Sequence, residues 1–159
     1  MSFVSRRTLL RVLAAPIYLP VSLAGQVTTH RVPKPLDPSA VTENWPSFLG
    51  PTFNAVSSET RLSRVLPPPI VWEFPTGSGY ASPVIFNGRL VYLHRVGDEE
   101  IVECLASETG AVYWRYRYST LYEDRYGYNN GPRASPVIDE QGGRVYTIGA
   151  EGILHAIEL

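Results

Sequence analysis

Apolar and polar residues alternate in short runs between residues 81 and 118, and this period of two is typical of β-strands. The predicted strands cover residues 83–86, 90–94, 101–106 and 112–118. Asn87-Gly88 is the strongest turn signal between them, because both residues tolerate the backbone angles of a tight hairpin. No apolar period of 3.6 residues occurs after residue 24, so we expect an all-β, antiparallel fold.

The chain repeats itself. Residues 81–85 (ASPVI) return as 134–138, a shift of 53 residues, and residues 88–92 (GRLVY) return as 143–146 (GRVY). Residues 102–105 (VECL) correspond to 154–157 (LHAI) in the same order. Short strands in a repeat of about 50 residues are typical of a β-propeller blade, which has four strands.

Several of these segments resemble the PQQ-like (quinoprotein-type) β-propeller repeat. They are ASP at 81–83, GRLVY at 88–92, LASETGAVYW at 105–114 and GAEGILHAIE at 149–158. Residues 45–51 (WPSFLGP) resemble the opening of bacterial exported members. The resemblance covers residues 45–159 and implies a partial β-propeller with about two four-stranded antiparallel blades. The implied parts are an outer strand at 70–75, a blade at 81–118 and a partial blade at 134–159.

The family pattern also implies how the blades are held together. Trp114 is expected to dock between neighbouring blades, held by the turn at Thr109-Gly110, and Trp72 matches the same outer-strand position. A flat aromatic side chain suits the wedge between two apolar sheets. About two blades cannot close a ring of four to eight, so we expect a fragment of a longer protein, or blades supplied by other chains.

The first 24 residues carry three arginines and no acid, followed by a short apolar run that ends in Ser22-Leu23-Ala24. These are the features of a signal peptide, with an uncleaved anchor as the alternative. Residues 5–11 (SRRTLLR) resemble the bacterial twin-arginine signal, and general secretory export is the alternative. We therefore expect a periplasmic or extracellular protein. Residues 25–44 hold three prolines among polar residues and predict a linker.

Charge and cysteine count narrow the classes of function. The chain has a net charge of −1, which becomes −4 without the three arginines of residues 1–24. An acidic exported protein has no electrostatic reason to bind nucleic acid or an anionic membrane, and we expect no stable membrane insertion after signal removal. A single cysteine, Cys104, excludes an intrachain disulfide framework and a multi-cysteine metal site.

Enzymes of the resembled family hold pyrroloquinoline quinone (PQQ) with a metal ion, using carboxylates, amides, a catalytic aspartate and often a cysteine pair. The chain lacks the pair, and no acidic group matches that site. Cys104 is expected to be a buried, inert thiol, and His94 and His155 have no nearby ligand spacing. We therefore predict no catalytic, cofactor-binding or metal residues, and a non-enzymatic scaffold. The alternative is the N-terminal part of a PQQ-dependent dehydrogenase whose catalytic blades lie elsewhere.

A tyrosine-rich segment, residues 122–133 (YEDRYGYNNGPR), lengthens the connection between the two repeats. Tyrosine offers a large contact area with few rotatable bonds, which suits a recognition loop on a rigid scaffold. The candidate contacts to another protein or an extracellular ligand are Tyr122, Asp124, Arg125, Tyr126, Tyr128 and Arg133. The alternative is a loop packed on its own blade, with Arg133 paired to Glu123 or Asp124.

Overall fold

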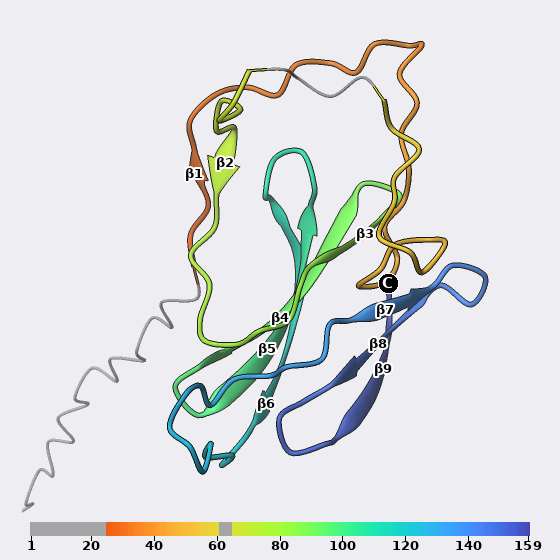
Figure 1. Ribbon diagram of the computed structural model, residues 1–159. Helices are drawn as coiled ribbons and strands as arrows, with labels where there is room; N and C mark the ends of the chain where they lie inside the picture. The colour runs from red at the N-terminus through yellow and green to blue at the C-terminus, as the bar shows by residue number, and fades with distance from the viewer. Residues whose placement is uncertain (1–24, 61–64) are drawn as a thin grey trace, which may run out of the picture.

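The computed structural model describes residues 25–60 and 65–159, which form three antiparallel β-sheets (Figure 1). The expected signal peptide lies outside the described residues. The two-stranded sheet has β1 (Thr28–Thr29) and β2 (Trp72–Glu73). The four-stranded sheet has β3 (Val84–Phe86), β4 (Arg89–Val96), β5 (Glu99–Ala106) and β6 (Val112–Ser119). The three-stranded sheet has β7 (Val137–Asp139), β8 (Arg144–Ile148) and β9 (Leu154–Glu158).

The described residues contain no helix, which confirms the predicted all-β, antiparallel fold. Within these residues, therefore, no helix has the length and apolar character that a membrane crossing requires.

The four-stranded sheet is a meander in the order β3-β4-β5-β6, built by tight turns at the predicted places. Asn87 and Gly88 both have positive φ angles, 46° and 74°, as a two-residue hairpin with matching twist requires. β4 runs two residues beyond the predicted end at residue 94, to Val96, and Arg95 is buried within it. In a sequence, a charged residue usually indicates the end of an apolar strand. Arg95 can nevertheless be buried, because its guanidinium group donates hydrogen bonds to backbone carbonyl oxygens.

The three-stranded sheet repeats the strand pairing of the four-stranded sheet. Val84 lies opposite Val91 and Val91 opposite Cys104, while Val137 lies opposite Tyr146 and Tyr146 opposite Ala156. The repeat found in the sequence therefore has the same register in both sheets.

The two larger sheets face each other across the apolar core. Five fully buried side chains of the four-stranded sheet meet Ile138 and Val145 of the three-stranded sheet. The five are Val84, Val91, Leu93, Val102 and Cys104. Burial of this kind contributes about 1.5–3 kcal/mol for each large aliphatic side chain. The second repeat thus covers one face of the first.

Polar contacts fix how these two sheets are placed. The Ser82 backbone N–H donates to Ser135 Oγ at 2.9 Å, joining equivalent positions of the two repeats. The Ala150 backbone N–H donates to Glu100 Oε1 at 2.8 Å, although Glu100 is buried. Residues 45–46 connect β3 and β7. Trp45 exchanges backbone hydrogen bonds with Ile85 of β3, and the Pro46 carbonyl oxygen accepts one from the Ile138 N–H of β7.

The two-stranded sheet lies along the other side of the molecule. β2 falls within the predicted outer strand at 70–75, and its partner β1 comes from the segment that the sequence predicts as a linker. Thr28 and Thr29 find backbone partners here because β2 offers an unpaired edge.

Candidate functional site

The loop between β6 and β7, residues 120–136, holds the tyrosine-rich segment. It begins at Thr120, which is buried and whose backbone N–H donates to Asp98 O at 2.9 Å. The Leu121 backbone N–H donates to Glu151 Oε1, in the turn between β8 and β9 of the three-stranded sheet, at 3.4 Å. The start of the loop is therefore attached to both of the larger sheets.

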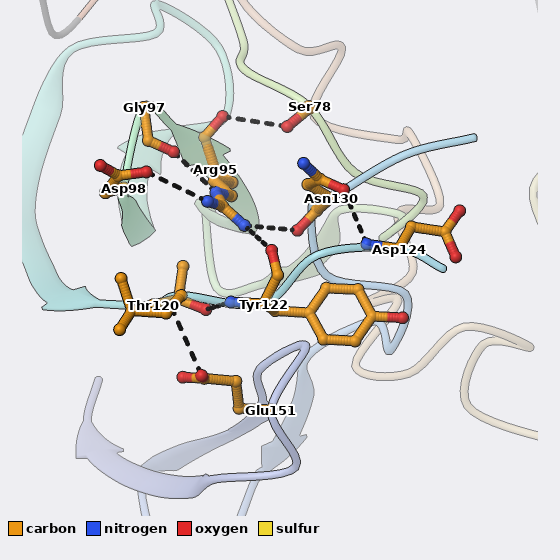
Figure 2. A network of polar contacts seen from close by, with 10 residues as sticks. Ser78, Arg95, Gly97, Asp98, Thr120, Tyr122, Asp124, Asn130 and Glu151 are labelled. Carbon is orange, nitrogen blue, oxygen red and sulfur yellow. Dashed lines mark hydrogen bonds and ion pairs between the residues drawn. The ribbon is translucent and has the colours of Figure 1, made fainter. Parts of the chain in front are cut away.

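Arg95 of β4 is the anchor of the loop (Figure 2). Its Nη1 donates to the carbonyl oxygens of Tyr122 at 2.6 Å and Asn130 at 3.1 Å, which lie on the two arms of the loop. Its Nε donates to Gly97 O at 2.6 Å, and its Nη2 lies 3.3 Å from Asp98 Oδ1. A planar guanidinium can serve several acceptors from one fixed position, so this buried side chain ties the loop to the β4–β5 turn.

Asp124 organises the middle of the loop. Its Oδ2 accepts the backbone N–H groups of Tyr128 at 2.8 Å and Asn129 at 3.2 Å, and its own N–H donates to Asn130 Oδ1. Desolvation alone would raise the pKa of this carboxyl group, but the backbone hydrogen bonds and the nearby Arg133 lower it below its usual value. The charged form of Asp124 therefore holds the turn.

Arg133 closes the loop. Its Nη2 lies 3.4 Å from Asp124 Oδ1, and its guanidinium carbon lies 5.9 Å and 5.3 Å from the ring centroids of Tyr80 and Tyr122. These distances are typical of cation–π contacts. Tyr122, Asp124 and Arg133 are thus engaged within the loop and its own sheet.

The other three candidates, Arg125, Tyr126 and Tyr128, are exposed to solvent. Tyr126 is 71% exposed and Tyr128 is 81% exposed, with ring centroids 6.3 Å apart. The Arg125 guanidinium lies 5.3 Å from the Tyr126 ring centroid. Beside Tyr128 is a hollow of about 410 Å³ that Glu123, Asp124, Asn129 and Asn130 help to line. We call Arg125, Tyr126 and Tyr128 the tyrosine platform.

Sequence reasoning missed Arg95 and Tyr80. Nothing local distinguishes a buried arginine from a solvated one, so no signal pointed to Arg95. Tyr80 had a signal, because it precedes Ala81 as Arg133 precedes Ala134. Since equivalent positions lie side by side, as Ser82 and Ser135 do, the repeat places Tyr80 next to Arg133.

The turn at Thr109-Gly110 packs against Trp72 of β2. From the sequence we expected this turn to hold Trp114 of β6. The Trp72 Nε1–H donates to Ser107 O at 3.1 Å, and a Cβ on Gly110 would lie 2.7 Å from Trp72 Cε3. Trp114 is half-buried against the core on the side of the three-stranded sheet. Each tryptophan therefore faces the sheet that follows it in the chain.

This packing predicts a difference between two glycine variants. Gly110 and Gly88 have similar φ angles, 71° and 74°, but a side chain at Gly88 would have nothing within 4 Å. Gly88→Ala should lower the free energy of unfolding by about 1–2 kcal/mol, from backbone strain alone. Gly110→Ala should lose about 1–3 kcal/mol more, because the methyl group displaces Trp72. Urea unfolding measures both, and equal losses would show that Trp72 does not need the glycine.

Buried polar groups lie on the face of the four-stranded sheet that points toward the two-stranded sheet. Arg115 Nε donates to Glu103 Oε2 at 2.6 Å, and His94 Nε2 lies 3.5 Å from Glu103 Oε1. The Gly77 N–H donates to His94 Nδ1, so this nitrogen carries the lone pair and Nε2 carries the proton. Burial alone would raise the pKa of Glu103, but His94 and Arg115 lower it. Both His94 and Glu103 are fully buried, so this cluster is structural.

The remaining candidates for chemistry are also enclosed. Cys104 is fully buried, and desolvation raises the pKa of its thiol to about 11, which disfavours the reactive thiolate. Burial and the neighbouring Glu100 raise the pKa of Tyr118. Within residues 25–60 and 65–159, no three metal-ligating side chains come together.

Comparison with known proteins adds no relative: no family model, no curated protein and no solved structure matches the chain.

Proposed function

We propose that the protein is an exported, non-enzymatic scaffold of the PQQ-like β-propeller type that binds a protein or an extracellular ligand through its tyrosine platform. The observation that carries this proposal is the contrast within the loop. Two tyrosine rings are largely exposed, at 71% and 81%, while the base of the same loop is held by the buried Arg95.

The propeller part of the proposal is supported by the stacking of the two larger sheets. They come from successive repeats, share one register and bury a common apolar core. Repeat units of this kind bury their faces by stacking on their neighbours, and loops at the ends of the strands then carry the binding residues.

The binding part is supported by the chemistry of the platform. Tyr126 and Tyr128 offer flat apolar faces, Arg125 offers hydrogen-bond donors, and the adjacent hollow has Glu123 and amide groups on its wall. Because Arg95 and Asp124 already fix the backbone, little conformational entropy is lost when a ligand binds. A peptide or a sugar, with apolar and hydrogen-bonding groups side by side, fits such a surface.

The test uses defined probes: a displayed library of random peptides and an array of oligosaccharides, both screened with the intact chain. Replacing Tyr126 and Tyr128 together by Ala should weaken binding of the selected probes at least about tenfold. Tyr113→Ala is the matched control, since Tyr113 is an exposed tyrosine outside the loop. Absence of any binding probe, or equal losses in both variants, would contradict the proposal.

A further inference from the structure

The hollow beside Tyr128 has a polar wall that the loop itself holds in place. Its volume is about 410 Å³, which falls within the range of small-molecule sites, roughly 300–1,000 Å³. The Arg95 guanidinium holds the carbonyl oxygen of Asn130, and the Arg133 guanidinium holds that of Asn129 at 3.2 Å. The side chains on this wall are therefore presented from a fixed backbone.

The two asparagine side chains on the wall have defined orientations. Asn129 Oδ1 accepts the Gly131 backbone N–H at 2.7 Å, and Asn130 Oδ1 accepts the Asp124 backbone N–H at 2.8 Å (Figure 2). A backbone N–H can only donate, so the oxygen of each side-chain amide must face it. The two Nδ2 groups have no acceptor among the residues that the structure describes, and both remain available as donors to a ligand.

The two carboxylates on the wall differ in what they can still bind. Both oxygens of Asp124 are engaged, one by the backbone N–H groups of the loop and one by Arg133 at 3.4 Å. Glu123 is exposed, and in the described part of the chain its carboxylate makes no hydrogen bond or ion pair. The hollow therefore offers one free acceptor, and its negative charge disfavours an anionic ligand.

Donors and a carboxylate on one wall are complementary to hydroxyl groups. A hydroxyl group accepts and donates through a single oxygen atom, whereas in a peptide backbone the donor and the acceptor are separate groups. Tyr128 adds an aromatic face that is largely exposed. This electron-rich face can stack on the C–H groups of a sugar ring.

We propose that the hollow and the Tyr128 ring form a binding site for a neutral saccharide. Its hydroxyl groups accept hydrogen bonds from the Nδ2 groups of Asn129 and Asn130 and donate to the Glu123 carboxylate, while one ring face lies on Tyr128. The inference rests on the binding role proposed above for the tyrosine platform. It adds the class of ligand and the residues that select it.

Two substitutions test the wall without disturbing the loop. Asn129→Asp keeps the oxygen that accepts the Gly131 N–H but removes the amide donors. Glu123→Ala removes the free acceptor, and Glu123 makes no contact that supports the fold. Asn54→Asp is the matched control, because Asn54 Oδ1 likewise accepts the backbone N–H two residues further on, from Val56 at 2.9 Å.

The intact chain is applied to an array of neutral and uronic-acid oligosaccharides of equal length, and the affinity for the best neutral one is measured by titration calorimetry. We expect the neutral oligosaccharides to bind in preference to the acidic ones. Asn129→Asp and Glu123→Ala should each weaken this binding at least about tenfold, because each removes a hydrogen bond of the site. Asn54→Asp should leave it unchanged.

Preference for the uronic-acid oligosaccharides would overturn this proposal, as would neutral binding that neither Asn129→Asp nor Glu123→Ala weakens. Peptides that bind through Tyr126 and Tyr128 while no oligosaccharide binds would overturn it too, but the binding role of the platform would stand. Absence of binding by peptides and oligosaccharides alike would contradict both proposals.

Discussion

Glu103→Ala is expected to lower the free energy of unfolding by about 3–5 kcal/mol, because it breaks a buried ion pair. Glu103 is fully buried and accepts the Arg115 Nε–H at 2.6 Å, with His94 Nε2 at 3.5 Å. Its removal leaves the buried His94 Nε2 without a nearby carboxylate and Arg115 without its anion. Because small domains have only about 5–15 kcal/mol of stability, the variant should be marginally folded at 37 °C.

Glu99→Ala is the control for this prediction. Glu99 is a glutamate of the same strand whose carboxylate lies 3.6 Å from Arg117, but unlike Glu103 it is half exposed to solvent. Its loss should cost less than about 1 kcal/mol. Both values come from urea unfolding followed by circular dichroism, and similar losses for the two variants would mean that the Glu103 cluster is solvated.

Arg95→Ala is expected to release the loop while leaving the sheets paired. The substitution leaves the carbonyl oxygens of Tyr122 and Asn130 without their donor, so the two arms of the loop lose their common attachment. Trypsin should then cleave after Arg125 at least about tenfold faster, because cleavage follows the population of the open loop. The removed buried hydrogen bonds should also lower the free energy of unfolding by about 2–3 kcal/mol.

Two further variants sharpen the result. Arg144→Ala removes an exposed arginine of β8 and should change neither the cleavage rate nor the stability measurably. Arg95→Lys keeps the charge but not the planar fork, so it should rescue stability only in part. Unchanged cleavage after Arg125 in Arg95→Ala would refute the anchoring role.

The sequence predicted the strands well because the evidence for them is local. The Asn87-Gly88 turn and the alternation on either side of it define the meander within a few residues, and the repeat carries the same order to the second sheet. The same self-similarity correctly pairs positions such as Ser82 and Ser135, which are hydrogen-bonded.

Features that depend on distant partners could not be predicted. β1 forms because residues 28–29 pair with the edge of β2, more than 40 residues away in the chain. Arg95 can be buried because carbonyl oxygens of the loop accept its hydrogen bonds. Of the six loop candidates, composition could not say that Tyr122, Asp124 and Arg133 would be engaged internally while Arg125, Tyr126 and Tyr128 remain exposed. That division is set by Asp124 and Arg95, whose partners are brought together only by the folded chain.

The second repeat stacks on the first and buries one of its faces, and the single thiol of the chain allows this stacking to be measured. Cys104 lies in that interface and is fully buried. A thiol reagent added to the native chain should label it at least about 100-fold more slowly than in urea, because labelling requires the two sheets to separate. Labelling at the unfolded rate, with the strand signal in circular dichroism intact, would show that the two repeats do not stack.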